Sequence, residues 1–321
     1  MSVTTGIEWT DATWNPVRGC SRVSSGCQNC YAERVAARFA GPQRKDGEVT
    51  DTPGPFAGFA THSPPRWTGL VALVEEHLLD PLRWRKPRRI FVNSMSDLFH
   101  ESLPDEAIDR VFAVMALAPR HTFQILTKRA MRMWMYGTSH YGGAASRATS
   151  IAGEVSRLCE ERGLPFQAVK WPLPNVWLGV SCEDQARADE RIPLLLQTPA
   201  AVRFVSAEPL LGPIELPPSS PCEYHRHDLD RCARLDWVIV GGESGPGARP
   251  CDIAWVRSIV AQCNADGVAG FVKQLGAQST GSVPVGVHGA RMDGCVRWQE
   301  DRKGGDPAEW PEDLRVREFP R

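Results

Sequence analysis

The feature of this 321-residue sequence that most restricts its fold is the alternation of short apolar runs with helical stretches. The runs are rich in Val, Ile and aromatic residues, which favour β-strands, and polar or glycine-containing turns bound them. The predicted strands are residues 89–94, 122–127, 175–181, 202–206, 235–240 and 270–274, with a further strand near residues 12–15. Because helical patterns at 104–117, 185–197 and 253–265 separate several of these runs, the sequence predicts βα units and a parallel sheet.

We therefore expect an α/β fold of the partial (β/α)6 TIM-barrel type over residues 1–276. Two loop insertions are expected, at about residues 136–150 and 215–232. The first opens with the Gly/Ser/Ala-rich stretch 136–146, which predicts a flexible loop before an extra helix. Residues 277–321 are predicted to form an irregular C-terminal extension packed on the barrel.

The charge balance excludes proteins that bind nucleic acid or membranes through their overall charge. Lys plus Arg number 37 and Asp plus Glu 38, a formal net charge of −1. The apolar runs are far shorter than the ~20 residues of a membrane-spanning helix, and the first residues lack the pattern of a secretory signal. We expect a cytoplasmic protein with no membrane partner.

Polar residues follow most predicted strands, at the end where the βα loops of a barrel form the active site. The candidate site residues there are Ser94, Ser96, Asp97, Lys128, Ser181, Glu183, Glu208, Gly241, Gly242 and Glu243. Pairs among the four carboxylates of this set suit a barrel hydrolase with a general acid and a general base. Ordinary solvation of strand ends explains part of the same pattern.

Three of the ten cysteines, Cys20, Cys27 and Cys30, fall on one predicted loop before a helix at residues 31–39. Three thiolates do not complete a tetrahedral zinc site by themselves. They can bind three irons of a 4Fe–4S cluster and leave the fourth iron open to another ligand. The alternatives are a zinc site completed by a distant His or Cys, and unrelated buried cysteines.

Several motifs together carry a resemblance to a known family. They are Trp14-Asn-Pro-Val-Arg-Gly-Cys20, Gly26-Cys-Gln-Asn-Cys-Tyr-Ala32, Phe91-Val-Asn-Ser-Met-Ser-Asp-Leu-Phe99, Leu126-Thr-Lys128, Gly179-Val-Ser181, Gly241-Gly-Glu-Ser-Gly-Pro-Gly-Ala-Arg-Pro250 and Lys303-Gly-Gly-Asp-Pro-Ala-Glu-Trp-Pro311. The sequence resembles the phage-associated three-Cys-motif proteins, which look like a divergent branch of the radical S-adenosylmethionine superfamily. Cys30, the last cysteine of the loop, is followed by Tyr31, and this Cys-Tyr pair is similar to that of spore photoproduct lyase.

The resemblance implies a partial barrel that holds a 4Fe–4S cluster on Cys20, Cys27 and Cys30, with S-adenosylmethionine on the open iron. The implied activity is the generation of a 5′-deoxyadenosyl radical, supplied with electrons by a reductant or electron donor. A nucleic acid or nucleotide is the implied substrate. A non-catalytic iron–sulfur or zinc protein that binds nucleic acid or a protein partner is the alternative.

Roles of the strand-end residues follow from the resemblance by strand order. Ser94, Ser96 and Asp97 would accept hydrogen bonds from the amine of S-adenosylmethionine. The ribose and carboxylate would meet Ser181 and Glu183, and Lys128 would neutralise a carboxylate or phosphate. The loop of Gly241, Gly242 and Glu243 would lie against adenine or substrate, with Arg249 reaching an anion.

Two features set this sequence apart from the superfamily pattern. Six residues separate Cys20 from Cys27, where the superfamily loop has three. Cleavage of S-adenosylmethionine is therefore a weaker expectation than cluster binding.

The second feature is a group of two thiols and two imidazoles in the insertion, which has the composition of a structural zinc site. This group comprises Cys222, His225, His227 and Cys232, and an ordinary surface loop is its alternative.

Overall fold

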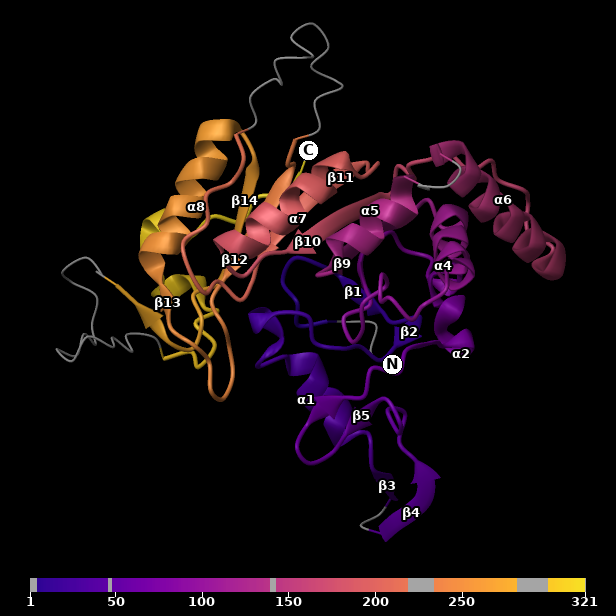
Figure 1. Ribbon diagram of the computed structural model, residues 1–321, viewed down its shortest axis with the longest axis horizontal. Coiled ribbons are helices and arrows are strands. Elements are labelled where there is room, and N and C mark those ends of the chain that lie inside the picture. Colours follow the sequence, from indigo (N-terminus) through magenta and orange to yellow (C-terminus); the bar gives the residue numbers. More distant parts are fainter. Residues whose placement is uncertain (1–4, 46–47, 139–142, 219–233, 282–299, 321) are drawn as a thin grey trace, which may run out of the picture. The chain divides into compact units, whose positions relative to one another are not determined.

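A computed structural model describes residues 5–45, 48–138, 143–218, 234–281 and 300–320 (Figure 1). A seven-stranded sheet has the order β1-β8-β9-β10-β11-β12-β14. Its strands are β1 (Ala12–Trp14), β8 (Arg89–Val92), β9 (Thr122–Thr127), β10 (Val176–Ser181), β11 (Val202–Ala207), β12 (Trp237–Gly241) and β14 (Ala269–Gln274). The pairs β1–β8, β8–β9, β11–β12 and β12–β14 are all parallel. Parallel strands in sequential order are those of a partial (β/α) barrel, so the predicted fold class is confirmed at that level.

The helices predicted from the sequence are present. They are α1 (Tyr31–Arg38), α4 (Asp105–Leu117), α7 (Gln185–Gln197) and α8 (Ile253–Asp266), together with α6 (Gly143–Arg162), the extra helix expected after the loop. The structure adds α2 (Glu75–Leu78), α3 (Asp80–Arg83) and α5 (Ala130–Thr138). The predicted loop at 136–146 is wrong at both ends, because α5 continues to Thr138 and α6 already begins at Gly143. Arg147 explains this difference: it donates to Asp109 at 2.8 Å, and its guanidinium carbon lies 4.0 Å from the ring centroid of Tyr136.

Short elements complete the described chain. The antiparallel pairs are β2 (Val17–Arg18) with β7 (Ala72–Leu73), β3 (Pro42–Lys45) with β4 (Glu48–Pro53), and β5 (Ala60–Thr61) with β6 (Arg66–Trp67). A parallel pair joins β13 (Cys251–Asp252) to β15 (Ser279–Thr280). Single-turn 3-10 helices cover η1 (Ser25–Cys27), η4 (Pro307–Glu309) and η5 (Glu312–Leu314).

The chain divides into two compact units. Unit 1 comprises Met1–Leu178 and Thr198–Ala201, and unit 2 comprises Gly179–Gln197 and Val202–Arg321. In unit 1, α4 packs against α6, as Figure 1 shows. The buried Trp14 ring contacts Phe123 at a centroid distance of 5.7 Å, and this contact joins β1 to β9. Both β8 and β9 are largely buried in this core, and polar residues follow each of them.

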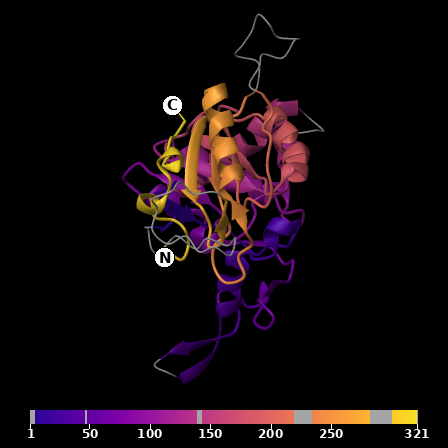
Figure 2. The ribbon, with the colours of Figure 1, turned by 90° about the vertical axis from the view of Figure 1, so that its left-hand side faces the viewer.

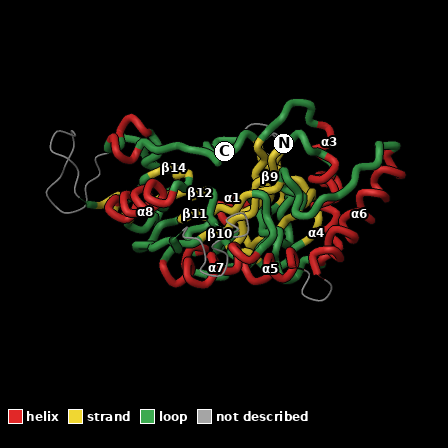
Figure 3. Tube along the Cα trace, turned by 90° about the horizontal axis from the view of Figure 1, so that it is seen from above, coloured by secondary structure: helices red, strands yellow, loops and turns green. Residues whose placement is uncertain are grey.

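In unit 2, α8 packs against β12 and β14 (Figures 2 and 3). Asp252 caps the start of α8 by accepting from Ala254 N at 2.9 Å, and Gly267 ends the helix with a φ of 65°. Residues 316–318 lie along β14: Val272 N donates to Val316 O, and Glu318 N donates to Gly270 O, both at 2.8 Å. Part of the predicted C-terminal extension therefore pairs with the last strand of the sheet.

Within the described ranges, none of the helices has the length and apolar character needed to cross a membrane.

Two other predictions are not tested by the structure. The predicted zinc ligands Cys222, His225, His227 and Cys232 lie outside the described residues. The single barrel domain over 1–276 stays a prediction.

Candidate functional site

The cysteine loop starts from a glycine that no other residue can replace without strain. Gly19 has a φ of +93°, and a Cβ atom built on it would lie 1.9 Å from the carbonyl oxygen of Leu70. Its backbone also forms a parallel bridge with Ser96, four residues past the end of β8. This bridge fixes Cys20 beside the segment that follows β8.

The loop is tied to the helix that follows it by a buried carboxylate. Glu33 on α1 has a side chain only 2% exposed, and Arg22 Nε donates to both of its oxygens at 3.1 Å. The backbone N–H of Trp67 donates to the same carboxylate at 2.9 Å. Because Arg22 lies inside the loop, the pair holds the backbone between Cys20 and Cys30 against α1.

All three cysteines of the loop are free thiols. Burial is the main cause that raises the pKa of Cys20 to about 12; Asp97, Cys30 and Cys27 raise it further, and Arg129 lowers it. Burial also raises the pKa of Cys30, although the backbone N–H of Glu33 and the Lys128 ammonium lower it. No group of three His, Cys, Asp or Glu side chains in the described part of the chain is arranged to hold a metal ion.

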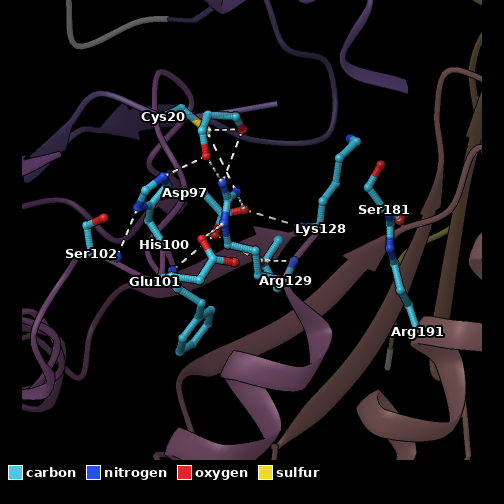
Figure 4. Close-up of polar contacts among 12 residues, drawn as sticks. Cys20, Asp97, His100, Glu101, Ser102, Lys128, Arg129, Ser181 and Arg191 are labelled. Atoms are coloured by element: carbon cyan, nitrogen blue, oxygen red, sulfur yellow. Dashed lines mark hydrogen bonds and ion pairs between the residues drawn. The ribbon is translucent and has the colours of Figure 1, made fainter. Parts of the chain in front are cut away.

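Arg129 lies at the centre of the polar cluster beside Cys20 (Figure 4). It follows β9 by two residues and is 5% exposed. Its Nη1 donates to Asp97 Oδ2 at 2.9 Å and to Cys20 Sγ at 3.8 Å, and its Nε donates to Glu101 Oε2 at 2.8 Å. Its Nη2 donates to the Ser21 carbonyl at 3.1 Å and to the Ser21 hydroxyl at 2.8 Å. One buried cation therefore links two carboxylates, a serine and a thiol.

Asp97 is buried and accepts four hydrogen bonds from the protein. Its Oδ1 accepts from Thr127 Oγ1 at 2.7 Å and from Phe99 N at 3.0 Å. Its Oδ2 accepts from Arg129 Nη1 and, at 3.3 Å, from Lys128 N. An ionised carboxylate has about four acceptor positions. The predicted contact between Asp97 and an amine stays a prediction, and it would have to displace one of these donors.

His100 closes the other side of the cluster. Its Nδ1 accepts from Ser102 N at 3.2 Å, so its Nε2 carries the proton and donates to Ser21 Oγ at 2.8 Å. Burial, followed by the charge of Arg129, lowers the pKa of His100 and keeps the ring neutral. In this tautomer the imidazole cannot take a proton from Ser21, so the pair is not an activated serine nucleophile.

The serines after β8 serve the backbone around the loop. Ser96 Oγ donates to Val17 O at 2.8 Å, and Ser94 Oγ donates to the side chain of Asn15 at 3.2 Å. The Tyr31 hydroxyl donates to the Ser94 carbonyl at 2.7 Å. Ser94, Ser96, Asp97 and Lys128 thus lie in unit 1 with the three cysteines, and their role at a common cofactor site stays a prediction.

In unit 2, Glu183, a predicted site residue that follows β10, forms a buried ion pair with Arg191. Glu183 is fully buried, and its Oε2 accepts from Arg191 Nη1 at 3.1 Å. The same Nη1 donates to Ser181 O at 2.7 Å, and Figure 4 shows Arg191 reaching from its helix toward Ser181. Ser181 Oγ donates to Glu208 O at 2.9 Å.

The residues that follow β11 and β12 form two more pairs in unit 2. Lys273 Nζ donates to Glu208 Oε1 at 2.8 Å. Arg249 donates to Glu243 Oε1 from Nη2 at 2.7 Å and to Oε2 from Nε at 3.0 Å. Arg249 was predicted to reach an anion, and the anion that it contacts in this structure is the carboxylate of Glu243.

The two glycines before Glu243 are required by close packing within unit 2. A Cβ on Gly242 would lie 2.3 Å from Leu275 O, and one on Gly241 would lie 2.9 Å from Glu208 Oε1. The predicted adenine- or substrate-binding loop is thus held against the end of β14, where Gln274 Nε2 donates to Gly242 O at 2.8 Å.

Sequence reasoning missed Arg129, His100 and Glu101 as site residues. Arg129 directly follows the predicted Lys128, and a second basic residue at a strand end was the available signal. His100 and Glu101 follow Asp97 by three and four residues on a loop, and no periodic pattern marks such positions.

The chain was compared with known families, curated proteins and solved structures. Residues 4–302 match the model of a family described as protein of unknown function, DUF5131. No curated protein and no solved structure matches the chain.

Proposed function

The chain belongs to the DUF5131 family, and we propose that it is an iron–sulfur enzyme of the radical S-adenosylmethionine type. In this proposal Cys20, Cys27 and Cys30 hold a 4Fe–4S cluster. The observation that carries it is the set of three free thiols on one loop, which Gly19 and the Arg22–Glu33 pair anchor beside the end of β8.

The chemistry of the donors supports such a cluster, although the three sulfurs are not arranged around a metal position in this structure. Three thiolates leave one iron open for S-adenosylmethionine. Burial raises the pKa values of Cys20 and Cys30, and the guanidinium of Arg129 and the ammonium of Lys128, respectively, oppose that rise. Because burial keeps both thiols protonated, metal binding must release protons and draw the sulfurs into ligating positions.

A zinc site on the same loop is less well supported. It needs a fourth protein ligand, and the neighbouring imidazole of His100 already uses both ring nitrogens in hydrogen bonds. A three-thiolate iron cluster needs no fourth protein ligand, so the loop serves it without disturbing His100.

A barrel hydrolase is also less well supported. Paired carboxylates of a hydrolase must reach the substrate and its attacking water. Each carboxylate in the predicted set instead forms an ion pair with an Arg or Lys side chain of this protein within 3.1 Å, namely Asp97, Glu183, Glu208 and Glu243. These contacts occupy oxygens that such a mechanism would need.

When bound, the cluster would supply one electron, received from an electron donor, for the cleavage of S-adenosylmethionine at the open iron. The protein's own residues would position the reactants. Ser94, Ser96 and Lys128 lie in the same unit as the cysteines and would contact the methionyl group. The substrate class we propose is a nucleic acid or nucleotide, which would donate the hydrogen atom.

The first experiment tests the cluster. Protein reconstituted anaerobically with iron and sulfide should bind about four irons and show thiolate-to-iron charge-transfer absorbance. Replacing Cys20, Cys27 and Cys30 by Ala should abolish both. Cys159→Ala is the matched control, because this buried free thiol lies on α6, away from the loop. Full iron content in the triple variant would overturn the proposal, and stoichiometric zinc in place of iron would favour a structural metal site.

The second experiment tests the reaction. Reduced, reconstituted protein should convert S-adenosylmethionine into 5′-deoxyadenosine, and the triple variant should not. Iron binding without this product would leave a non-catalytic iron–sulfur protein.

A further inference from the structure

The guanidinium of Arg129 is held by more partners than an ordinary ion pair requires. Asp97 fixes Nη1, Glu101 fixes Nε, and the carbonyl and hydroxyl of Ser21 fix Nη2, all between 2.8 and 3.1 Å. A planar guanidinium bound on three sides has no rotational freedom left. The contact of Nη1 with Cys20 Sγ at 3.8 Å is therefore built into the arrangement.

The partners of this cation are unequal in exposure. The side chain of Asp97 is 8% exposed and that of Arg129 is 3% exposed, whereas that of Glu101 is 62% exposed. Solvent screens the charge of Glu101, so the buried field at the Cys20 sulfur comes mainly from Arg129 and Asp97. These two groups act on the sulfur with opposite signs.

We propose that Arg129 is a positioning residue that holds the Cys20 sulfur for metal binding and, with Asp97, sets the reduction potential of the cluster bound there. This inference rests on the proposed function. Reduction adds one electron, taken from the donor, to the cluster and its thiolates; no bond to Arg129 forms or breaks. A guanidinium N–H directed at the sulfur stabilises the added negative charge, and hydrogen bonds to cluster sulfurs are a known means of tuning potential.

The test is the midpoint potential of the reconstituted protein, measured by EPR-monitored redox titration. Arg129→Gln should shift the potential to more negative values, because it removes the positive charge next to Cys20. Asp97→Asn should shift it to more positive values, because the opposing negative charge is lost. Arg132→Gln is the control: Arg132 lies on α5 and donates to Leu103 O at 3.3 Å, and its carboxylate partner is Asp105. It should leave the potential unchanged.

Two additional variants keep the test decisive if Arg129→Gln fails to fold. Arg129→Lys keeps the charge near Asp97 but lacks the planar fork, and it should lower the potential by less than Arg129→Gln. The double variant Arg129→Gln/Asp97→Asn removes both buried charges, and its potential should lie between those of the single variants. A merely structural role for Arg129 predicts no pair of shifts with opposite signs.

Failure of the inference can be told from failure of the proposed function. If the wild-type protein binds no iron, the cluster itself is wrong. If the wild type and the variants all bind iron and the midpoint potentials agree within error, the cluster stands and the role of Arg129 is overturned.

Discussion

The polar residues that follow β9 in unit 1 and those that follow β10, β11 and β12 in unit 2 use the same chemistry in two different ways. In unit 2 three ion pairs each join a cation to a carboxylate: Arg191 with Glu183, Lys273 with Glu208, and Arg249 with Glu243. In unit 1 a single arginine joins two carboxylates, a serine and a thiol. The ion pairs of unit 2 bring together opposite charges, whereas the cation of unit 1 also contacts the sulfur of Cys20, which we propose as a metal ligand. The first arrangement is suited to holding strand ends in place, and the second to chemistry.

The largest expected effect concerns the Arg191–Glu183 ion pair of unit 2, and it tests whether that pair serves stability alone. Arg191→Met removes the cation that donates to the buried Glu183 carboxylate, and it should lower the free energy of unfolding by about 3–5 kcal/mol in urea titrations. The double variant Glu183→Met/Arg191→Met removes both charges and should lose much less stability. Iron content after reconstitution should stay at the wild-type level for any variant that folds. Loss of iron in a folded Arg191→Met protein would show that the two regions are not separate in function.

The second expected effect concerns Gly19 in unit 1, and it tests whether the packing of this glycine anchors the cysteine loop. Gly19→Ala places a Cβ against Leu70 O and should cost about 3 kcal/mol of stability, together with most of the bound iron. Gly69→Ala is a matched control, because Gly69 has a similar φ of +88° but no atom within 4 Å of a built Cβ. It should cost only about 1–2 kcal/mol and keep its iron. Equal losses in the two variants would mean that the steric contact does not anchor the loop.

The smallest expected effect concerns pH and a titrating group that belongs to the cluster in unit 1. The folded protein depresses the pKa of His100, so the unfolded chain binds a proton there at a higher pH than the folded chain does. The stability due to neutral His100 is therefore present above about pH 6.5, and it is lost as the pH falls below that value. His100→Gln should flatten the decline in unfolding free energy of the iron-free protein between pH 7 and pH 5. A decline as steep as in the wild type would exclude His100 as its source.

Elements with one clear pattern were predictable from the sequence. The apolar run at 122–127 and the helix at 185–197 match β9 and α7 residue for residue, because a buried strand and an amphipathic helix leave distinct periodic signals. The hairpin of β3 and β4 was not predicted, since its polar, charged segments have no apolar alternation. Helix α6 is the extra helix expected after the Gly/Ser/Ala-rich loop, but its start at Gly143 was not predicted. The Gly/Ala/Ser residues of its first turn favour a loop, and the burial of Arg147 against Asp109 and Tyr136 is a tertiary effect that local propensity does not contain.

The site residues also differ in whether a local sequence pattern reveals them. Cys20, Cys27 and Cys30 could be found because their type and spacing are themselves chemical information, and Asp97 because it follows a strand. The partners of these residues could not be assigned, because they depend on distances across the fold. Arg191 lies in mid-helix and meets Glu183 eight residues earlier, and Arg129 meets Cys20 more than a hundred residues earlier. A sequence shows which groups are available; the fold decides which of them satisfy one another.

The pairing of residues 316–318 with β14 has a consequence for how the protein behaves at high concentration. β14 is the last strand of the sheet, and an unpaired outer strand offers its backbone N–H and C=O groups to any other chain. Here Val316 and Glu318 occupy those groups, and Trp237 Nε1 donates to Glu318 O at 2.8 Å. The covering segment lies more than forty residues downstream of the strand it protects. A folding intermediate in which this segment has not yet docked would therefore be open to aggregation through β14, and substitutions that weaken docking should reduce soluble yield before they alter any chemistry.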